Sequence, residues 1–230
     1  MKSIYIGVCK TRNHEQFEES FRNLTDSMCK KYLVCQMIVK DKFLPDAQNE
    51  ITADFLQSGY DYLLFLDDDQ WGHTVEMVDT LVEANAYVAT IKTYVRQYPY
   101  SCALFRYCAP NVVMPVETGY GYVECDLTGF PMTLIRRDTF EHLEQPYFRP
   151  YEAIGRAWNS DVDFFLRLAE KGIKPIGCFQ YILNHDKVTA ENVLELRHKD
   201  RLEGNNVARW RLQKAIEEGS FKLEDLTVLK

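Results

Sequence analysis

Short apolar runs alternate with amphipathic segments over the first part of the chain. The runs have the length and the β-branched and aromatic content of buried strands, and they cover residues 3–8, 32–39, 62–66 and 86–91. In the segments between them apolar residues recur every three or four positions, as on one face of a helix: residues 14–31, 45–57 and 73–85. The repeated order of strand, helix and strand predicts parallel strands joined by crossover helices, a Rossmann-like nucleotide-binding arrangement.

The pattern changes after residue 92. Short aromatic and β-branched pieces broken by proline and glycine fill residues 93–123, which predicts hairpins and loops in an inserted acceptor-side region. A strand and a short helix, then an amphipathic helix, then one or two strands are expected at 131–143, 160–172 and 175–183. From residue 188 onward the chain is charged and has a helical pattern.

No internal repeat, low-complexity tract or linker divides the chain, so we expect a single domain over residues 1–230. Within it we expect a nucleotide-binding half at about 1–92, an acceptor-side half at about 93–186 and a C-terminal helical appendage at 187–230. The expected fold class is α/β, with a Rossmann-like, mixed but mostly parallel sheet flanked by helices.

The composition supports a folded domain and argues against some functions. A hydrophobic fraction of 46% over 230 residues is enough for a sizeable core. A net charge of -7 without a cluster of lysine and arginine argues against binding to nucleic acid. No run approaches the roughly 20 apolar residues of a membrane-spanning helix, so we expect a soluble, cytoplasmic protein without an integral membrane segment. The seven cysteines are scattered and contain no CxxC pair, which favours reduced thiols over disulfides or structural zinc.

Three consecutive aspartates follow the most strand-like run of the chain, YLLFL at 62–66. Ligands of open α/β sheets bind beyond the carboxyl ends of strands, so the position of these aspartates is itself informative. Side chains two apart on an extended segment point the same way, and Asp67 and Asp69 can together approach one Mn²⁺ or Mg²⁺ ion, with Asp68 on the other side. The alternative is that the aspartates cap the following helix. An EF-hand calcium loop starting at Asp67 is excluded, because Val78 occupies the position of its bidentate acid.

Three segments in this order resemble the family-2 glycosyltransferases of the GT-A fold: YLLFLDDDQ, CDLTGFPMTLIRRDTFE and WNSDVDFFLRLAEKGIKPIG. The first corresponds to the strand that ends in the DxD motif of the family, and the third to its ED-containing helix. Asp161, Asp163 and Phe164 match that helix, whereas Ser160 replaces the usual glutamate. The resemblance runs from about residue 3 to 186 and implies a nucleotide-sugar-dependent glycosyltransferase with a single-domain GT-A fold.

The resemblance also implies roles for residues at the reacting centre. Asp67 and Asp69 would bind the metal with His185 as a third ligand, and an ordinary turn histidine is the alternative for His185. Asp161 would be the general base that deprotonates the acceptor hydroxyl in an inverting displacement, with a helix cap as the alternative. If the enzyme retains configuration, Asp161 would only orient the acceptor.

Substrate contacts are implied on both sides of this centre. The donor nucleotide sugar is expected to contact Thr11, Arg12, Asp41, Asn49, Asp68 and Gly129. Trp158 and Asp163 are expected to contact the acceptor. The family often carries an Arg-Asn pair where this chain has Gln48 and Asn49. Further candidates for the pyrophosphate, with a structural role as the favoured alternative, are Arg136, Arg137 and Arg156.

These observations predict transfer of a sugar from a nucleoside diphosphate sugar, with UDP as the expected nucleotide, to a hydroxyl group of a glycan or another acceptor. Two other functions remain open. A nucleotidyltransferase of related topology would need a glycine-rich phosphate loop, and the segment VCKTRNHE after the first strand contains no glycine. A non-catalytic carbohydrate-binding protein is the second alternative, against which the intact run of aspartates argues.

Overall fold

The computed structural model describes residues 1–95, 101–109, 112–153, 156–158, 160–186, 188–193 and 195–196. Its central sheet has seven strands in the order β2 (Leu33–Lys40), β1 (Ser3–Lys10), β3 (Tyr62–Asp67), β10 (Met132–Arg136), β5 (Val88–Lys92), β13 (Ile176–Ile182) and β8 (Tyr122–Glu124). β10 and β8 run against the direction of the other strands. The mixed, mostly parallel sheet expected from the sequence is therefore confirmed.

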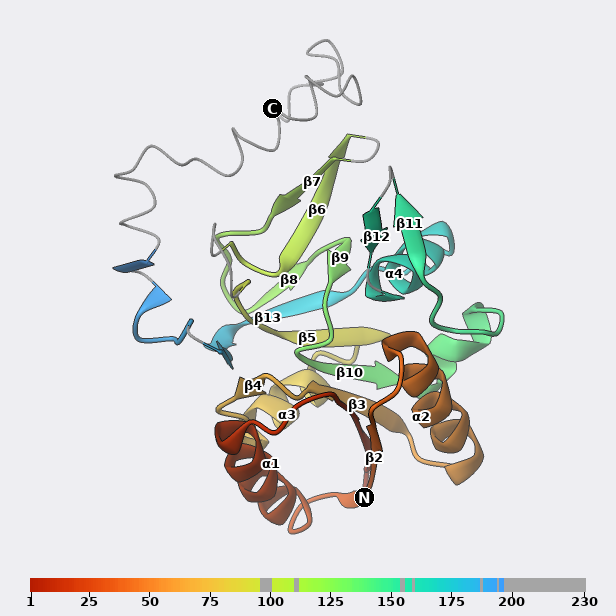
Figure 1. Cartoon of the computed structure of the whole chain (residues 1–230), viewed down its shortest axis with the longest axis vertical. Helices are drawn as coiled ribbons and strands as arrows, with labels where there is room; N and C mark the ends of the chain where they lie inside the picture. Colours follow the sequence, from red (N-terminus) through yellow and green to blue (C-terminus); the bar gives the residue numbers. More distant parts are fainter. Residues whose placement is uncertain are drawn as a thin grey trace.

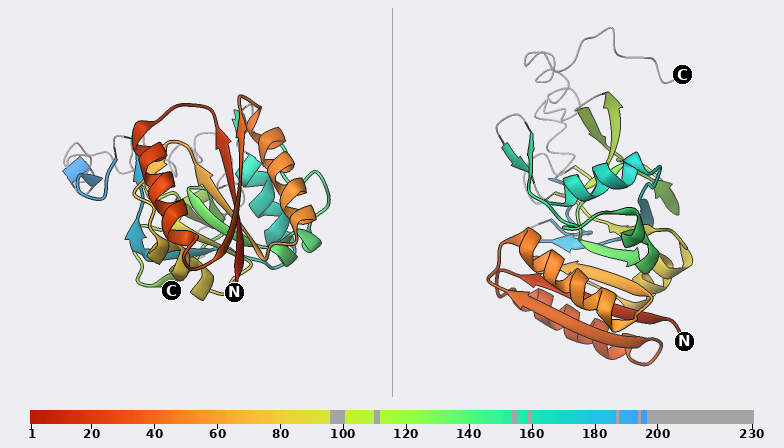
Figure 2. Two further views of the ribbon diagram at one scale, coloured as in Figure 1. Left: turned by 90° about the horizontal axis from the view of Figure 1, so that it is seen from below. Right: turned by 90° about the vertical axis from the view of Figure 1, so that its right-hand side faces the viewer.

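Helices cover both faces of the sheet (Figures 1 and 2). α1 (Glu15–Met28) and α3 (Val75–Glu83) pack on one face, and α2 (Leu44–Ser58) and α4 (Ser160–Glu170) pack on the other. The central strands are apolar on both sides because both sides are covered: β1 sends Ile4 and Ile6 to the first face and Tyr5 to the second.

Close packing of α2 on β1 follows from a glycine in the strand. A Cβ atom at Gly7 would lie 2.5 Å from Cγ2 of Ile51, so only a residue without a side chain allows the helix this near to the strand. α2 carries Pro45 in its first turn and ends at Ser58, and it is followed by Gly59, whose φ is +79°. The sheet and α2 thus form a firm support for residues at the start of this helix.

The remaining elements form smaller sheets and one short helix. β6 (Leu104–Ala109) pairs with β7 (Val112–Pro115) and β9 (Leu127–Thr128), which confirms a hairpin in the region predicted to hold hairpins. The pairs β4 (Gln70–Trp71) with β14 (Asn184–His185) and β11 (Tyr151–Ala153) with β12 (Arg156–Trp158) have no counterpart in the sequence pattern. A 3₁₀ helix, η1 (Arg137–His142), follows β10.

The predicted elements of the first half are all present, with ends that differ by a few residues. The helix expected at 14–31 ends at Met28, and the one expected at 73–85 begins at Val75. The helical pattern from residue 188 onward lies largely outside the described residues. Within the described part of the chain, no helix is both long enough and apolar enough to cross a membrane.

Candidate active site

The carboxyl ends of the parallel strands meet at one edge of the sheet (Figure 1). Several predicted site residues follow these strand ends in the sequence. The acidic run follows β3, and Thr11 and Arg12 follow β1. β10 enters the sheet from the same edge, so the turn before it, which contains Gly129, lies beside the end of β3. The backbone N–H of Asp67 donates to the carbonyl oxygen of Pro131 in this turn at 3.1 Å. Sheet topology therefore brings three separate segments of the chain together.

A short ladder joins the acidic run to a distant segment of the chain. β4 pairs antiparallel with β14, which sets His185 opposite Gln70. This pairing places Nε2 of His185 3.3 Å from Oδ2 of Asp69. The backbone N–H of Asp186 also donates to the carbonyl oxygen of Asp69 at 3.2 Å. The structure thus brings together two of the three side chains predicted to bind a metal.

A hydrogen bond on the other side of the His185 ring fixes its tautomer. Nδ1 lies 2.8 Å from the carbonyl oxygen of Tyr94, and because a carbonyl oxygen only accepts, Nδ1 carries the hydrogen. In the neutral ring the lone pair of Nε2 then faces the carboxylate of Asp69, and these atoms repel unless a proton or a cation lies between them. Neighbouring ligands of an octahedral ion with bonds of about 2.1 Å are about 3 Å apart, so the pair fits Mg²⁺ or Mn²⁺.

Asp67 has a hydrogen-bond partner in the turn that follows it. The amide nitrogen of Gln70 donates to Oδ2 of Asp67 at 3.4 Å. Oε1 of Gln70 is buried and has no hydrogen-bond partner in the described structure. A cation bound in this turn would give that oxygen a partner. Among the described residues, no three acidic, histidine or cysteine side chains converge closely enough to bind a metal. A three-ligand site therefore requires Asp67 to turn toward Asp69 and His185.

Asp68 has a different partner from its two neighbours. Its Oδ2 accepts hydrogen bonds from the backbone N–H groups of Thr11 and Arg12, at 2.6 and 2.8 Å, and from the Thr11 hydroxyl at 3.2 Å. The residue is 7% exposed. Bonds from N–H groups to a carboxylate are stronger than bonds between neutral groups, so Asp68 fastens the loop after β1 to the acidic run. Contacts of these three residues with a donor remain a prediction.

Replacing Asp68 by alanine should loosen the loop after β1. Three hydrogen bonds to one buried carboxylate are lost, so we expect the free energy of unfolding to fall by about 2–3 kcal/mol. Hydrogen exchange at the amides of Thr11 and Arg12, measured by NMR, should become about tenfold faster or more. Asp68→Asn keeps the shape and one acceptor, and should show a smaller change. Unaltered exchange at both amides in Asp68→Ala would contradict this role.

Asp161 lies in the first turn of α4 and faces the turn before β10. Its Oδ2 is 3.6 Å from the position that a Cβ atom at Gly129 would occupy, and its Oδ1 accepts from the N–H of Val162 at 3.0 Å. Burial raises the pKa of Asp161 to about 6. A carboxylate with such a pKa can take up a proton near neutral pH. Because Pro131 of the same turn bonds to Asp67, this turn links Asp161 to the acidic run.

Other predicted contact residues have partners within the chain. The side-chain amide of Asn49 donates to the carbonyl oxygen of Phe148 at 2.8 Å and accepts from its N–H at 3.0 Å. Asp163 forms an ion pair of 2.8 Å with the arginine one turn later in α4. Asp41 is exposed at the end of β2 with a φ of +54°. The side chain of Trp158 lies outside the described residues. Substrate contacts of these residues remain predictions.

Sequence reasoning did not identify the residues that support this site. The hydroxyl of Ser160 donates to Oε1 of Gln48, and both residues are buried. The carbonyl group of Tyr94 orients His185, and the amide of Gln70 contacts Asp67. For the contact between Ser160 and Gln48 the sequence held one signal: both residues differ from the pattern of the resembled family.

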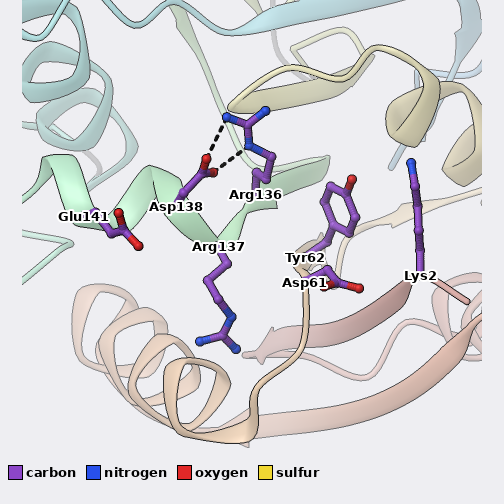
Figure 3. Close-up of a pocket in the computed structure, with 7 residues that line it drawn as sticks. All are labelled: Lys2, Asp61, Tyr62, Arg136, Arg137, Asp138 and Glu141. Carbon is purple, nitrogen blue, oxygen red and sulfur yellow. Dashed lines mark hydrogen bonds and ion pairs between the residues drawn. The ribbon is translucent and has the colours of Figure 1, made fainter.

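A cavity of about 420 Å³ lies at the opposite end of the sheet (Figure 3). It is lined by Lys2, Asp61, Tyr62, Arg136, Arg137, Asp138 and Glu141. Tyr62 begins β3 and Arg136 ends β10, which places the cavity away from the acidic run at the end of β3. Arg136 pairs with Asp138, and Arg137 donates to backbone carbonyl groups, so both arginines already have partners in the chain. This location supports the structural alternative for the two arginines.

No protein-family model matches the sequence, and no curated protein matches it. Among solved structures, A197 from STIV is similar over 80% of this chain and 85% of that chain, with a TM-score of 0.56 and 16% identity. Glucosyl-3-phosphoglycerate synthase from Mycobacterium tuberculosis, in complex with Mn²⁺, UDP-glucose and phosphoglyceric acid, is similar over 86% of this chain and 76% of that chain, with a TM-score of 0.51 and 11% identity. At these identities the likeness establishes the fold alone, and the GT-A fold predicted from the sequence is confirmed.

Proposed function

We propose that this protein is a metal-dependent glycosyltransferase that transfers a sugar from a nucleoside diphosphate sugar, with UDP as the expected nucleotide, to a hydroxyl group of a glycan or another acceptor. The observation that carries the proposal is the pair of Asp69 and His185, 3.3 Å apart at the carboxyl edge of a GT-A sheet. A carboxylate oxygen and a neutral imidazole nitrogen are suitable ligands for Mn²⁺, with Asp67 as the expected third ligand. Mn²⁺ and UDP-glucose, named with the M. tuberculosis synthase, are the first ligands to try.

The proposed reaction is an inverting displacement at the anomeric carbon. The acceptor oxygen bonds to that carbon as its proton passes to the carboxylate of Asp161, and the diphosphate leaves with the electrons of the broken carbon–oxygen bond. A bound Mn²⁺ or Mg²⁺ would stabilise the negative charge on the leaving diphosphate. Asp161 suits this role because a pKa of about 6 leaves it ionised at neutral pH yet basic enough to accept a proton. In a retaining enzyme Asp161 would only orient the acceptor.

The loop after β1 argues against the nucleotidyltransferase alternative. A phosphate-binding loop presents free backbone N–H groups to the ligand. Here the N–H groups of Thr11 and Arg12 already donate to Asp68, at 2.6 and 2.8 Å, and residues 11–14 contain no glycine. Two donors that such a loop would offer to phosphates are therefore engaged within the chain. Membership of glycosyltransferase family 2 and a cytoplasmic location belong to the same proposal and rest on the sequence.

Calorimetric titration of UDP, GDP and their common sugar conjugates into the full-length protein tests the proposal. We expect one nucleotide to bind in the presence of Mn²⁺ and to lose about tenfold or more in affinity when Mn²⁺ is omitted or Asp69 is replaced by asparagine. Asp138→Asn removes a carboxylate at the opposite end of the sheet and should bind like the wild type. Binding that needs neither Mn²⁺ nor Asp69 would contradict the metal site, and binding of no nucleotide would refute the proposed function.

A further inference from the structure

A buried polar contact joins α2 to the first residue of α4. Ser160 donates its hydroxyl hydrogen to Oε1 of Gln48, and the two residues are 1% and 3% exposed. Losing either partner would leave a buried polar atom of the other unsatisfied, so the contact specifies how the two helices meet. Asp161 follows Ser160 directly, and the contact therefore lies one residue from the proposed base.

The side of the contact contributed by α2 is rigidly held. Ile51 of this helix is fully buried against the backbone of β1 at Gly7. Asn49, the neighbour of Gln48, binds the backbone of Phe148 through both ends of its amide, at 2.8 and 3.0 Å. Phe148 in turn stacks on Phe164 of α4, with 4.9 Å between the ring centroids. Consecutive residues of α2 thus hold the start of α4 and the ring that packs beneath it.

Within the part of the chain that the structure describes, the hydrogen bonds to the Asp161 carboxylate come from the backbone of its own helix turn. One carboxylate oxygen accepts from the N–H of Val162 at 3.0 Å, and the other faces the turn at Gly129. Two charged residues of the same helix, Asp163 and Arg167, pair with each other at 2.8 Å. The groups of α2 and of the turn at Gly129 that lie near the first turn of α4 are uncharged. Loss of contact with water raises the pKa of Asp161. The direction of the carboxylate therefore depends on how the first turn of α4 is held.

We infer that Gln48 is a positioning residue for Asp161: by accepting the hydrogen bond of Ser160 it fixes the first turn of α4, and with it the direction of the proposed base. The inference rests on the proposed function for the role of Asp161 as base. The geometric part, that Gln48 and Ser160 together hold this partly buried carboxylate against the turn at Gly129, stands on the contacts alone.

Carbon-13 NMR titration of the Asp161 carboxyl group in full-length protein tests the inference without a substrate. The variants are Gln48→Met and Ser160→Ala, which remove the acceptor and the donor, and Ser160→Thr, which keeps the hydroxyl. We expect the titration midpoint of Asp161 to fall by about one pH unit in the first two variants, because a loosened first turn admits water to the carboxylate. Ser160→Thr should restore the wild-type midpoint. With an identified donor, kcat should fall about tenfold or more in the first two variants while the KM for donor stays constant.

A matched control separates positioning from general stability. Thr139→Val removes a fully buried hydroxyl of η1 that donates to the carbonyl oxygen of Tyr87 at 2.8 Å, at the other end of the sheet. It should lower the melting temperature about as much as Ser160→Ala and leave the Asp161 titration unchanged. If Asp161 titrates alike in wild type, Gln48→Met and Ser160→Ala, the inference is overturned. Failure of the proposed function would show itself differently, as absence of metal-dependent nucleotide binding.

Discussion

Asp161→Asn is expected to be nearly inactive and yet more stable than the wild type at neutral pH. An asparagine cannot take the proton of the acceptor hydroxyl, so kcat should fall by about 10²- to 10⁴-fold if Asp161 is the general base. The same substitution removes a partly buried group whose raised pKa means that its ionisation opposes folding. The free energy of unfolding at pH 7.5 should therefore rise by roughly 2 to 3 kcal/mol. Rates and urea denaturation curves of the same preparations measure the two effects.

The dependence on pH separates a buried carboxylate from other causes of stabilisation. Burial raises the pKa of Asp161 from its ordinary value of 3.8 to about 6, so the ionised group weakens the folded state above pH 6. Protonation removes this effect between pH 6 and about 4, and the wild type should gain stability relative to the variant through that window. Near pH 3.5 the two proteins should unfold alike. Asp26→Asn on the exposed side of α1 should match the wild type throughout.

Two outcomes would contradict this expectation. A variant less stable than the wild type at pH 7.5 would mean that the carboxylate makes favourable contacts in its ionised form. A stability difference that is the same at pH 7.5 and 3.5 would mean that its cause is not ionisation. An active Asp161→Asn variant would leave the fold and the metal pair untouched but remove the inverting mechanism, in favour of the retaining alternative.

The helices and central strands could be predicted because their signals are local. Phe17, Phe21 and Leu24 recur at helical spacing in the sequence and are all buried in α1. The pairing of β4 with β14 could not be predicted, because a ladder of two residues per strand has no periodicity. That ladder nevertheless determines the site, since it brings His185 to Asp69. Motif resemblance suggested both residues, and tertiary contacts explain why they meet.

In the acidic run, the sequence pattern predicts the directions of the three aspartate side chains only in part. Alternation along an extended segment predicts that Asp68 points away from its neighbours. In the structure Asp68 and Asp69 form a turn after β3, and Asp68 bonds to the loop after β1 while Asp69 faces His185. The same reasoning predicts that Asp67 joins Asp69 at one ion, which stays a prediction; in the structure Asp67 accepts a hydrogen bond from Gln70. β3 ends at Asp67 and a turn follows at Asp68 and Asp69, so the alternation of the strand does not continue through the acidic run, and no period in the sequence reveals this.

Two positions that differ from the pattern of the resembled family are connected in the structure. Gln48 stands where the family often has arginine, and Ser160 where it usually has glutamate. The sequence offers no reason to link two positions so far apart, but the side chains are hydrogen-bonded and buried. Compared with the resembled family, Gln48 replaces a positive side chain and Ser160 a negative one. Because both positions are uncharged here, their contact contains no buried charge without an opposite partner. The departures are therefore compatible with a working site.

Arg137→Met should strongly destabilise the fold, although Arg137 lies in a charged pocket that could pass for a ligand site (Figure 3). Its guanidinium group donates to the carbonyl oxygens of Phe55, Leu56 and Tyr60, at 2.8, 2.9 and 2.5 Å, and lies 4.6 Å from the centre of the Phe55 ring. Two of these carbonyl groups belong to the last turn of α2, where the helix provides no N–H partner for its final carbonyl groups and a positive charge is favourable; the carbonyl oxygen of Phe55 also accepts from the Ser58 hydroxyl at 2.6 Å. We expect the free energy of unfolding to fall by about 2–4 kcal/mol, measured by urea denaturation.

Arg136→Met is the matched control, one residue away in sequence and in the same pocket. Arg136 bonds to the partly exposed carboxylate of Asp138, at 2.6 and 2.7 Å, and stacks on the ring of Tyr87. Contacts of this kind at the surface contribute little, so its loss should change the free energy of unfolding by about 1 kcal/mol or less. Equal losses in the two variants would contradict the capping role of Arg137.

Because both arginines lie at the end of the sheet opposite the acidic run, folded protein of either variant should bind the nucleotide with Mn²⁺ as the wild type does. Loss of that binding in folded Arg137→Met would instead restore the arginine as a candidate for the pyrophosphate.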